Sequence, residues 1–357
     1  MIRCPYCLTN VDPNLTNQGY LCPNKECNAG IYRDFVEKPK IPRATVGLVG
    51  FTGHGKTVYL SALFYSLKHL KRNHTWGENF NWVTLDENTH KIMYVDVPKL
   101  EEESKLPDGT PENFPHPALI QFDQIPFFGD YFLSFYDTAG RVYESSEKIT
   151  DMGRFVAYSE VVLFIISIKD CDRSWADHIE GLLDTYIHAV YNYLRIDLKK
   201  NQHLIVLLSK ADDIDKLPNE LREFLQNGSY NWYRVGDSQN RRDEKKIIAS
   251  QLGQLKENSR IIKDWLMKNE GKGFVTLAKK HFRRVEYTIV SSLGAAPVGN
   301  MLKTKLKPTD PKRVLDPFLW ILEKTRPKGV WERIKGVAEW IWERIKEVAD
   351  VYMDPWR

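Results

Sequence analysis

One stretch near the beginning of the chain decides the fold. It reads Gly50-Phe51-Thr52-Gly53-His54-Gly55-Lys56-Thr57, followed by Val58. This spacing fits G-x-x-x-x-G-K-[ST], the phosphate-binding loop, in full. Residues 44–49 are a short apolar run typical of a buried strand, and residues 58–74 place leucines on one helical face. Strand, loop and helix therefore occur in the order that the motif requires.

The residue types of this loop indicate what it can bind. Backbone N–H groups of the loop and of the helix that follows would surround phosphate groups. Lys56 would bridge the outer phosphates, and the Thr57 hydroxyl would bind Mg²⁺. His54 occupies a variable position of the motif. A side chain pointing away from the phosphates is the commoner outcome there, and a catalytic base is the alternative.

Two later motifs bear on which nucleotide the loop takes. A strand at residues 132–136 runs into Asp137-Thr138-Ala139-Gly140. The Asp137 carboxylate can hold the Mg²⁺ shell, and the Gly140 N–H can sense a terminal phosphate. A buried strand at residues 204–208 runs into Ser209-Lys210-Ala211-Asp212. The Asp212 carboxylate can accept two hydrogen bonds from guanine, which adenine cannot offer, while the Lys210 stem would lie over the base.

Together these motifs resemble the Ras-like (TRAFAC) P-loop GTPases, whose fingerprints are the P-loop, D-x-x-G and [NT]-K-x-D. The resemblance covers residues 44–326, and bacterial Rab-like and double-GTPase families look closest. It implies an α/β fold with a six-stranded, mostly parallel sheet, helices on both faces, and GTP or GDP bound with Mg²⁺. It also implies that Ser291, Ser292 and Leu293 form the loop that contacts the guanine carbonyl.

The resemblance further implies a switch threonine that joins Thr57 and Asp137 around Mg²⁺. Thr110 lies in a turn-rich loop ahead of an expected strand at residues 117–125, where that threonine should be. The alternative is that Thr110 is a turn residue and nothing more. The catalytic set carried over by the resemblance is Lys56, Thr110, Gly140 and Arg141.

Three residues depart from the family pattern. Ser209 replaces Asn or Thr, although its hydroxyl can still tether the loop. Arg141 stands where many relatives carry a glutamine that orients the attacking water; it cannot accept a proton but could stabilise phosphate charge. Thr52 replaces a glycine and can crowd an incoming arginine finger. These departures predict slow intrinsic hydrolysis, or a protein partner or a homodimer that completes the site.

The amino-terminal segment carries a second kind of site. Cys4, Cys7, Cys22 and Cys27 form two short loops, C-x-x-C and C-x-x-x-x-C, ahead of the phosphate-binding loop. Four thiolates brought together by a hairpin make a closed tetrahedral zinc site, which would supply the folding energy that so short a segment lacks. Four reduced core cysteines are the alternative. Few basic residues flank the cysteines, so a packing or protein-facing role is favoured over nucleic acid.

The expected organisation is a zinc ribbon at residues 1–36, a linker at 37–43, a GTPase domain at 44–326 with a helical insertion at about 217–283, and an amphipathic helix at 327–357. The last segment contains an eleven-residue repeat, and its apolar side is rich in tryptophan. Its polar face mixes acids and bases, which favours contact with protein over a membrane surface. The insertion would serve as a lid or partner surface, or pack on the edge of the sheet.

The bulk composition agrees with a cytoplasmic protein. No apolar leader begins the chain, the net charge is only +4, and four of the five cysteines fall in the first 27 residues. The small net charge argues against nucleic acid as a partner. The sequence thus predicts a GTP-binding switch that hydrolyses GTP slowly and signals to a protein partner. The alternative is a scaffold that binds the nucleotide with little or no hydrolysis.

Overall fold

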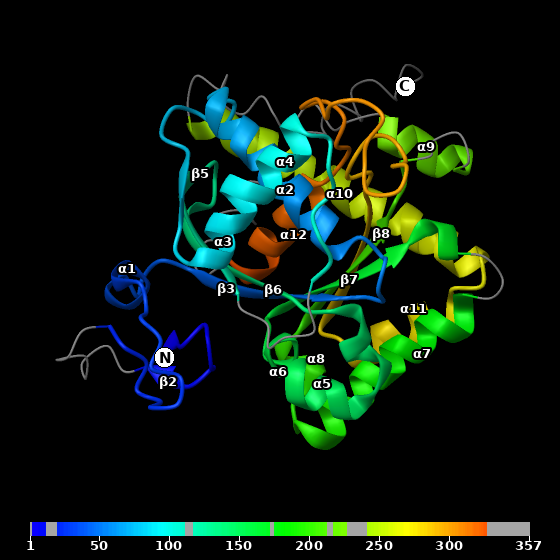
Figure 1. The fold of residues 1–357 in the computed structure, drawn as a ribbon. Helices are drawn as coiled ribbons and strands as arrows, with labels where there is room; N and C mark the ends of the chain where they lie inside the picture. The colour runs from blue at the N-terminus through cyan, green and yellow to red at the C-terminus, as the bar shows by residue number, and fades with distance from the viewer. Residues whose placement is uncertain are drawn as a thin grey trace, which may run out of the picture.

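The computed structural model describes residues 2–11, 20–110, 117–171, 175–212, 217–226 and 241–326. The amphipathic helix expected at residues 327–357 lies outside these ranges. A two-stranded hairpin, β1 (Ile2–Arg3) and β2 (Asn10–Val11), and a short helix, α1 (Arg33–Glu37), form the amino-terminal part. The rest is built on one large sheet covered by helices (Figure 1).

The large sheet has seven strands in the order β4-β5-β6-β3-β7-β8-β9. Their bounds are β3 (Arg43–Val49), β4 (Asn81–Thr84), β5 (Ala118–Ile125), β6 (Gly129–Asp137), β7 (Val161–Ser167), β8 (His203–Ser209) and β9 (Arg284–Ile289). The five strands from β6 to β9 are parallel, whereas β5 pairs antiparallel with both β4 and β6. The sheet is therefore mixed and mostly parallel. It has seven strands and not six, because β4 lengthens the antiparallel side.

The two central strands β7 and β8 explain the parallel pairing. Every residue of both strands is buried, and both are nearly continuous apolar runs. Such runs suit strands that are covered on both faces, where crossover helices connect parallel neighbours. The chain passes from β3 to β6 on one side and then to β7 on the other. This reversal makes the carboxyl end of β3 the topological switch point, where α/β folds bind ligands.

One face of the sheet is covered mainly by α2 (Lys56–Arg72), α4 (Val97–Glu102) and α12 (Leu315–Thr325), with α3 (Glu87–Lys91) beside β4 and β5. The other face is covered by α5 (Ser146–Met152), α6 (Arg154–Ala157), α7 (Trp175–His188), α8 (Leu198–Asn201) and α11 (Lys272–His281). The two helical layers stand above and below the strands in Figure 1. Trp320 of α12 is fully buried, which ties the end of the described chain to the core.

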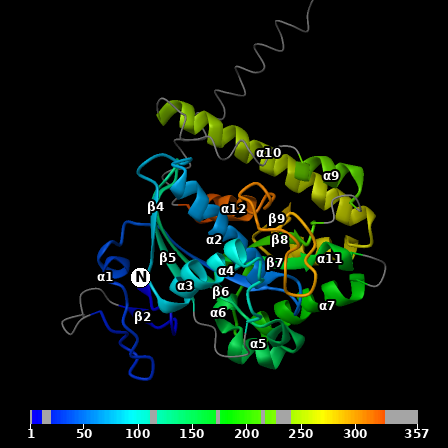
Figure 2. The same cartoon turned by 45° about the horizontal axis from the view of Figure 1, so that its top comes forward.

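The described part of residues 217–283 consists of α9 (Asn219–Gln226), α10 (Arg241–Lys268) and α11. Figure 2 shows α10 as a long helix along one side of the molecule. Ser259 of α10 accepts a hydrogen bond from the Tyr287 N–H at 2.9 Å and lies 3.2 Å from the Glu286 carboxylate. Because β9 is an edge strand, this helix covers backbone groups that would otherwise be open to pairing. In the insertion, α10 therefore packs on the edge of the sheet, as the second of the two alternatives expected.

The amino-terminal part packs against the face of β5 and β6 that carries Leu119 and Phe132. Leu119 of β5 and Phe132 of β6 belong to the same apolar cluster as Cys4 and Phe35. The Tyr136 hydroxyl, also on β6, donates a 2.7 Å hydrogen bond to the Pro5 carbonyl between the first two cysteines. The four-cysteine segment is therefore part of the packed molecule.

Arg43, at the start of β3, holds the connection between the amino-terminal part and the sheet. Its guanidinium donates hydrogen bonds to the carbonyls of Phe35, Lys38 and Ile41 at 2.5, 3.0 and 2.9 Å. It also lies over the rings of Phe35 and Phe132. The Arg43 side chain therefore fixes the expected linker, because its guanidinium bonds to carbonyls of that linker and of α1. No helix in the described ranges is long and apolar enough to cross a membrane.

Replacing Arg43 with methionine keeps the apolar stem but removes every guanidinium donor. Carbonyls left without partners are costly, so we expect the free energy of unfolding to fall by about 2 kcal/mol. Urea unfolding followed by tryptophan fluorescence measures the change. Arg33→Met is the matched control, because Arg33 is an exposed residue of the same segment whose guanidinium contacts the side chains of Glu37 and Tyr20 and no backbone carbonyl among the described residues. Equal midpoints for both variants would contradict the role of Arg43.

Candidate functional site

A cavity of about 730 Å³ opens at the carboxyl ends of β3 and β8. Most residues expected to bind nucleotide line it: Thr52, Gly53, Gly55, Lys56, Thr57, Val58, Thr110, Gly140, Arg141, Ser209, Lys210, Asp212, Ser292 and Leu293. Gly50, His54, Asp137 and Ser291 do not line the cavity directly. The fold therefore collects residues from five separate segments at the switch point of the sheet.

The glycine loop after β3 has the backbone that its sequence requires. Gly55 caps the start of α2 with φ at +84°, a left-handed conformation that side chains disfavour. Lys56 is buried, and its ammonium donates to the Gly50 and Phe51 carbonyls at 2.8 and 3.2 Å. Burial lowers the pKa of Lys56. A buried cation in the first turn of a helix is suited to an anionic ligand.

Gly140 lies directly against the glycine loop. A Cβ atom at Gly140 would come within 2.1 Å of the Thr52 nitrogen, so no larger residue fits without moving the loop. Gly140 begins a short 3₁₀ helix, η2 (Gly140–Glu144), in which Arg141 is exposed and borders the cavity. The segment after β6 and the loop after β3 are therefore coupled through backbone contact.

Thr57, Thr110 and Asp137 converge at one end of the cavity. The Thr57 and Thr110 hydroxyls lie 2.8 and 2.6 Å from the same Asp137 oxygen, Oδ2, and 2.8 Å from each other. Burial raises the pKa of Asp137, and hydrogen bonding from Thr110 and the charge of Lys56 act against this rise. Asp137 Oδ1 is buried with no hydrogen-bond partner among the described residues. Two hydroxyls and an unsatisfied carboxylate oxygen are a donor set that could hold Mg²⁺ or its bound water.

Asp212 occupies the other part of the cavity. Its Oδ1 accepts hydrogen bonds from the Ser291 hydroxyl at 2.6 Å and the Leu293 N–H at 3.2 Å. Burial raises the pKa of Asp212, and the Ser291 bond opposes the rise. Lys210, two residues earlier, adopts φ of +60°, a strained conformation for a side chain of this kind. Such strain collects at functional sites, where the surrounding fold holds it in place.

Ser209 and His54 connect the two parts of the site. The Ser209 hydroxyl lies 2.6 Å from the His54 carbonyl and 3.1 Å from that of Ile166, so it tethers the loop after β8 to the loop after β3. The His54 ring is buried with its Nδ1 3.0 Å from the Ile165 carbonyl and its Nε2 3.2 Å from the Asp170 carboxylate. Burial lowers the pKa of His54. Its side chain therefore faces β7 and not the cavity.

Two further segments border the cavity that sequence reasoning had not assigned to it. Lys169 follows β7 directly, and the rule that ligands bind at the carboxyl ends of parallel strands could have found it. Residues 296–300 also line the cavity, and backbone bonds join them to the segment before Thr110. The Leu106 N–H donates to the Asn300 carbonyl at 2.9 Å, and the Leu302 N–H donates to the Ser104 carbonyl at 2.8 Å. No sequence signal marks this pairing.

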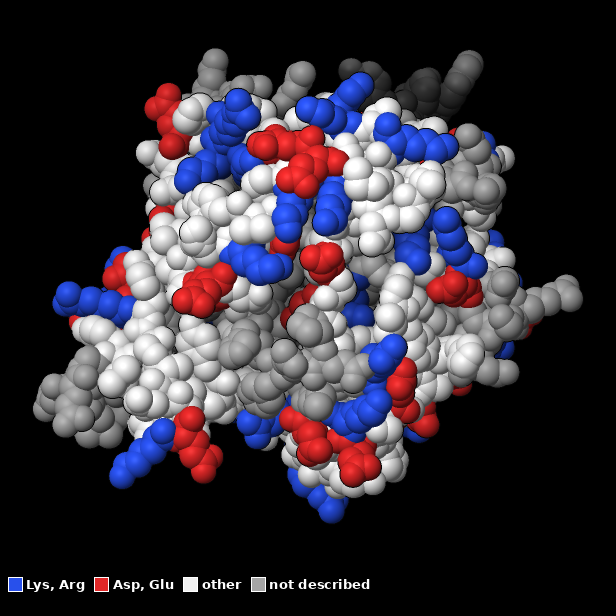
Figure 3. Space-filling view, viewed as in Figure 1, with Lys and Arg blue, Asp and Glu red and all other residues white. Residues whose placement is uncertain are grey.

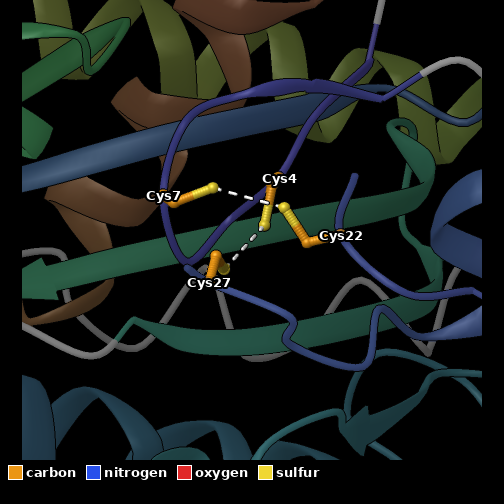
Figure 4. A group of neighbouring side chains, drawn as sticks. All are labelled: Cys4, Cys7, Cys22 and Cys27. Atoms are coloured by element: carbon orange, nitrogen blue, oxygen red, sulfur yellow. Dashed lines mark hydrogen bonds between the residues drawn. The ribbon is translucent and has the colours of Figure 1, made fainter. Parts of the chain in front are cut away.

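The four amino-terminal cysteines form a second cluster, shown in Figure 4. Their sulfur atoms all lie within 4.8 Å of one another. The two loops share one backbone plan despite their different spacings. In each, the first cysteine N–H donates across the loop, Cys4 to the Thr9 carbonyl and Cys22 to that of Ala29. In each, the residue after the second cysteine has a positive φ.

The cluster fits a bound metal ion. A Zn–S distance of about 2.3 Å in a tetrahedron places the sulfurs about 3.8 Å apart. The observed separations, 3.3 Å for Cys7–Cys22 and 4.0 Å for Cys4–Cys27, bracket this value. Burial raises the pKa of Cys4, and it raises that of Cys22 to about 11. Thiolates at these positions therefore need a nearby positive charge, which a divalent cation supplies. The four cysteines are positioned to bind a metal such as Zn²⁺.

No protein-family model matches the chain, and no curated protein matches it as a relative. The α/β fold with its mixed, mostly parallel sheet and the amino-terminal four-cysteine cluster are established by the structure itself.

We expect the purified protein to carry about one equivalent of zinc, and Cys27→Ser to lose it, because a serine hydroxyl is a poor substitute for a thiolate ligand. Elemental analysis by mass spectrometry after gel filtration measures the content. Cys171→Ser is the matched control, since Cys171 follows β7 and lies outside the cluster. Metal-free wild-type protein, or equal loss in both variants, would contradict a four-thiolate site.

Proposed function

We propose that the chain is a GTP-binding switch of the Ras-like P-loop class, with a zinc ribbon packed on its sheet. The observation that carries this proposal is the arrangement of one cavity with two chemically different parts. One part offers Lys56, a loop of backbone N–H groups, and the Thr57–Thr110–Asp137 cluster. The other offers a partly buried carboxylate at Asp212. A nucleoside triphosphate with Mg²⁺ has matching parts in the same order.

The base preference rests on Asp212. Guanine presents two adjacent N–H donors, at N1 and N2, whereas adenine presents an acceptor at N1. The Ser291 and Leu293 bonds both go to Asp212 Oδ1 and fix the carboxylate, and no hydrogen bond to Oδ2 is found among the described residues. A carboxylate held in this way would be left unsatisfied by adenine, which is costly in a desolvated site. The Lys210 stem borders the same part of the cavity and would cover the base plane.

The hydrolytic machinery follows from the other part of the cavity. Mg²⁺, when bound, would neutralise charge on the outer phosphates. Lys56 would leave the Gly50 and Phe51 carbonyls to contact those phosphates, and Thr57 and Thr110 would turn their hydroxyl oxygens from Asp137 to the cation. Arg141 could stabilise negative charge as the terminal phosphate leaves, but its guanidinium cannot accept a proton from water. Slow hydrolysis, accelerated by a protein partner or by dimerisation, is the consequence.

The switch itself would be the segment that ends at Thr110 and the segment that begins at Gly140. Thr110 can reach a cation only while its segment is ordered against Thr57, and Gly140 touches the loop beside Thr52. Loss of the terminal phosphate would release both contacts, as in other switches of this type. A protein partner would then read the order of these segments.

Base discrimination tests the proposal most directly. We expect wild-type protein to bind a fluorescent GDP analogue and not the ADP analogue, and Asp212→Asn to weaken GDP binding by at least about a hundredfold. Asparagine offers an acceptor for N1–H and a donor for the xanthine oxygen at C2. The same variant should therefore gain affinity for the xanthosine analogue. Fluorescence titration gives all three dissociation constants.

Asp264→Asn serves as the control for this titration, because Asp264 is an exposed carboxylate of α10 paired with Arg260. It removes the same charge far from the cavity and should leave every affinity unchanged. Equal binding of GDP and ADP by the wild-type protein would overturn the guanine assignment and point to an ATP-binding protein.

Turnover separates the switch from the alternative, a scaffold that keeps its nucleotide. We expect multiple-turnover phosphate release from GTP that is slow but measurable, and abolished by Lys56→Ala, because Lys56 is the buried cation at the phosphate end. Purified protein is assayed over a range of concentrations, so that dimerisation shows as a rate that rises with concentration. Phosphate release equal to that of Lys56→Ala at every concentration would favour the scaffold.

A further inference from the structure

A second hollow, of about 890 Å³, lies at the opposite edge of the sheet from the cavity. Its walls come from the amino ends of β3, β7, β8 and β9, the end of α12 and the first cysteine loop. The strands between the two hollows are about seven residues long, so roughly 20 Å of sheet separates them. We call this hollow the basal groove.

The basal groove concentrates positive charge. Its lining has eight lysine and arginine side chains and three aspartate and glutamate side chains, a surplus of five. The whole chain has a net charge of only +4. The rest of the molecule is therefore close to neutral, and on the face seen in Figure 3 basic and acidic side chains are interspersed. A concave surface with one sign of charge focuses the field on what enters it.

Each acidic side chain that lines the basal groove already has a basic side chain near it. Glu323 lies 3.0 Å from Lys324, which also pairs with Glu286 at 2.6 Å, and Asp197 lies 3.4 Å from Lys200. The positive charge of Arg3 acts on Glu160, although burial raises the Glu160 pKa to about 7.

Three exposed arginines of the basal groove have no acidic side chain near them among the described residues. Among the described residues, no acidic side chain lies within ion-pair distance of Arg195, Arg283 or Arg284, all of which line the basal groove. Arg195 follows the C-cap residue of the π-helix at residues 189–193, and its φ of 56° is the left-handed conformation common just past a helix end.

His203, at the start of β8, is an independent sign of an unmet contact. It lines the basal groove with 7% of its surface exposed, and its Nδ1 is buried with no hydrogen-bond partner among the described residues. Burial and the nearby charges of Arg283, Lys324 and Arg284 lower its pKa to about 4. His203 is therefore neutral at neutral pH, when its ring carries one N–H donor.

We propose that the basal groove binds a compact polyanion, a small ligand that carries two or more phosphate groups. Guanidinium groups bind phosphate oxygens in pairs, which favours Arg195, Arg283 and Arg284 as the phosphate contacts. The hollow is of the size that encloses small ligands. A single-stranded nucleic acid needs a longer basic track with several stacking rings, and the Tyr158 ring here already lies under Arg3.

The test is calorimetric titration of inorganic tripolyphosphate into the full chain saturated with GDP. We expect saturable binding that Arg283→Gln/Arg284→Gln weakens by roughly tenfold or more. Lys303→Gln/Lys305→Gln removes the same charge from an exposed loop outside the basal groove and should change affinity little. Unchanged zinc content and circular dichroism in both double variants would show that they fold.

The titration is repeated with Lys56→Ala, which makes the result independent of the proposed GTP site. Binding that survives Lys56→Ala and is lost in Arg283→Gln/Arg284→Gln assigns the polyanion to the basal groove whether or not the chain binds GTP. No saturable binding, equal weakening by the lysine control, or dependence on Lys56 would overturn the proposal. So would binding of polyglutamate or of single-stranded DNA that tripolyphosphate does not displace.

Discussion

The parallel pairing of β3 with both β6 and β7 is the constraint on which the rest of the structure depends. It places the glycine loop at the middle of the sheet, with the end of β6 on one side and the end of β7 on the other. Asp137 then lies beside Thr57, and Gly140 meets the backbone of Thr52. Across β7, the end of β8 brings the Ser209 hydroxyl to the His54 carbonyl. One strand arrangement thus assembles both parts of the cavity, whatever ligand it takes.

The same strand β6 connects the four-cysteine segment to the cavity. Side chains alternate along it, so Leu133 and Phe135 pack under α2 while Phe132 and Tyr136 point to the other face. Phe132 packs against the amino-terminal part there, and the Tyr136 ring packs on Phe155 while its hydroxyl reaches the Pro5 carbonyl. Asp137 follows Tyr136 directly. A short segment with few apolar residues can serve as a layer over a sheet only if something rigidifies it, which a bound metal does. The packing of the four-cysteine segment on β6 therefore also bears on the position of Asp137, the next residue after Tyr136.

Local motifs predicted the strands and loops around the cavity and most of the residues that line it, because these depend on short stretches of sequence. The loop from Gly50 to Thr57, the end of β6 and the end of β8 were each recognisable from a buried strand followed by polar residues. Pairings between distant loops could not be recognised from the sequence. The bonds of Leu106 with Asn300, the position of α10 along β9 and the added strand β4 depend on tertiary contacts that leave no periodic signal. The basal groove could not be predicted for a similar reason, since its arginines come from five separate segments.

The pairing of residues 104–106 with residues 300–302 has a consequence for the proposed switch. The first segment leads to Thr110, and the second belongs to the loop that follows Ser291 and Leu293, the two partners of Asp212. Two backbone hydrogen bonds therefore join the segment that leads to Thr110, at the cation end of the cavity, to the loop at the base end. A ligand at one end of the cavity would stabilise only one of the two paired segments, whereas a complete nucleotide would stabilise both. The order of Thr110 would then report the presence of base and terminal phosphate together, which is the property that a partner must sense in a nucleotide switch.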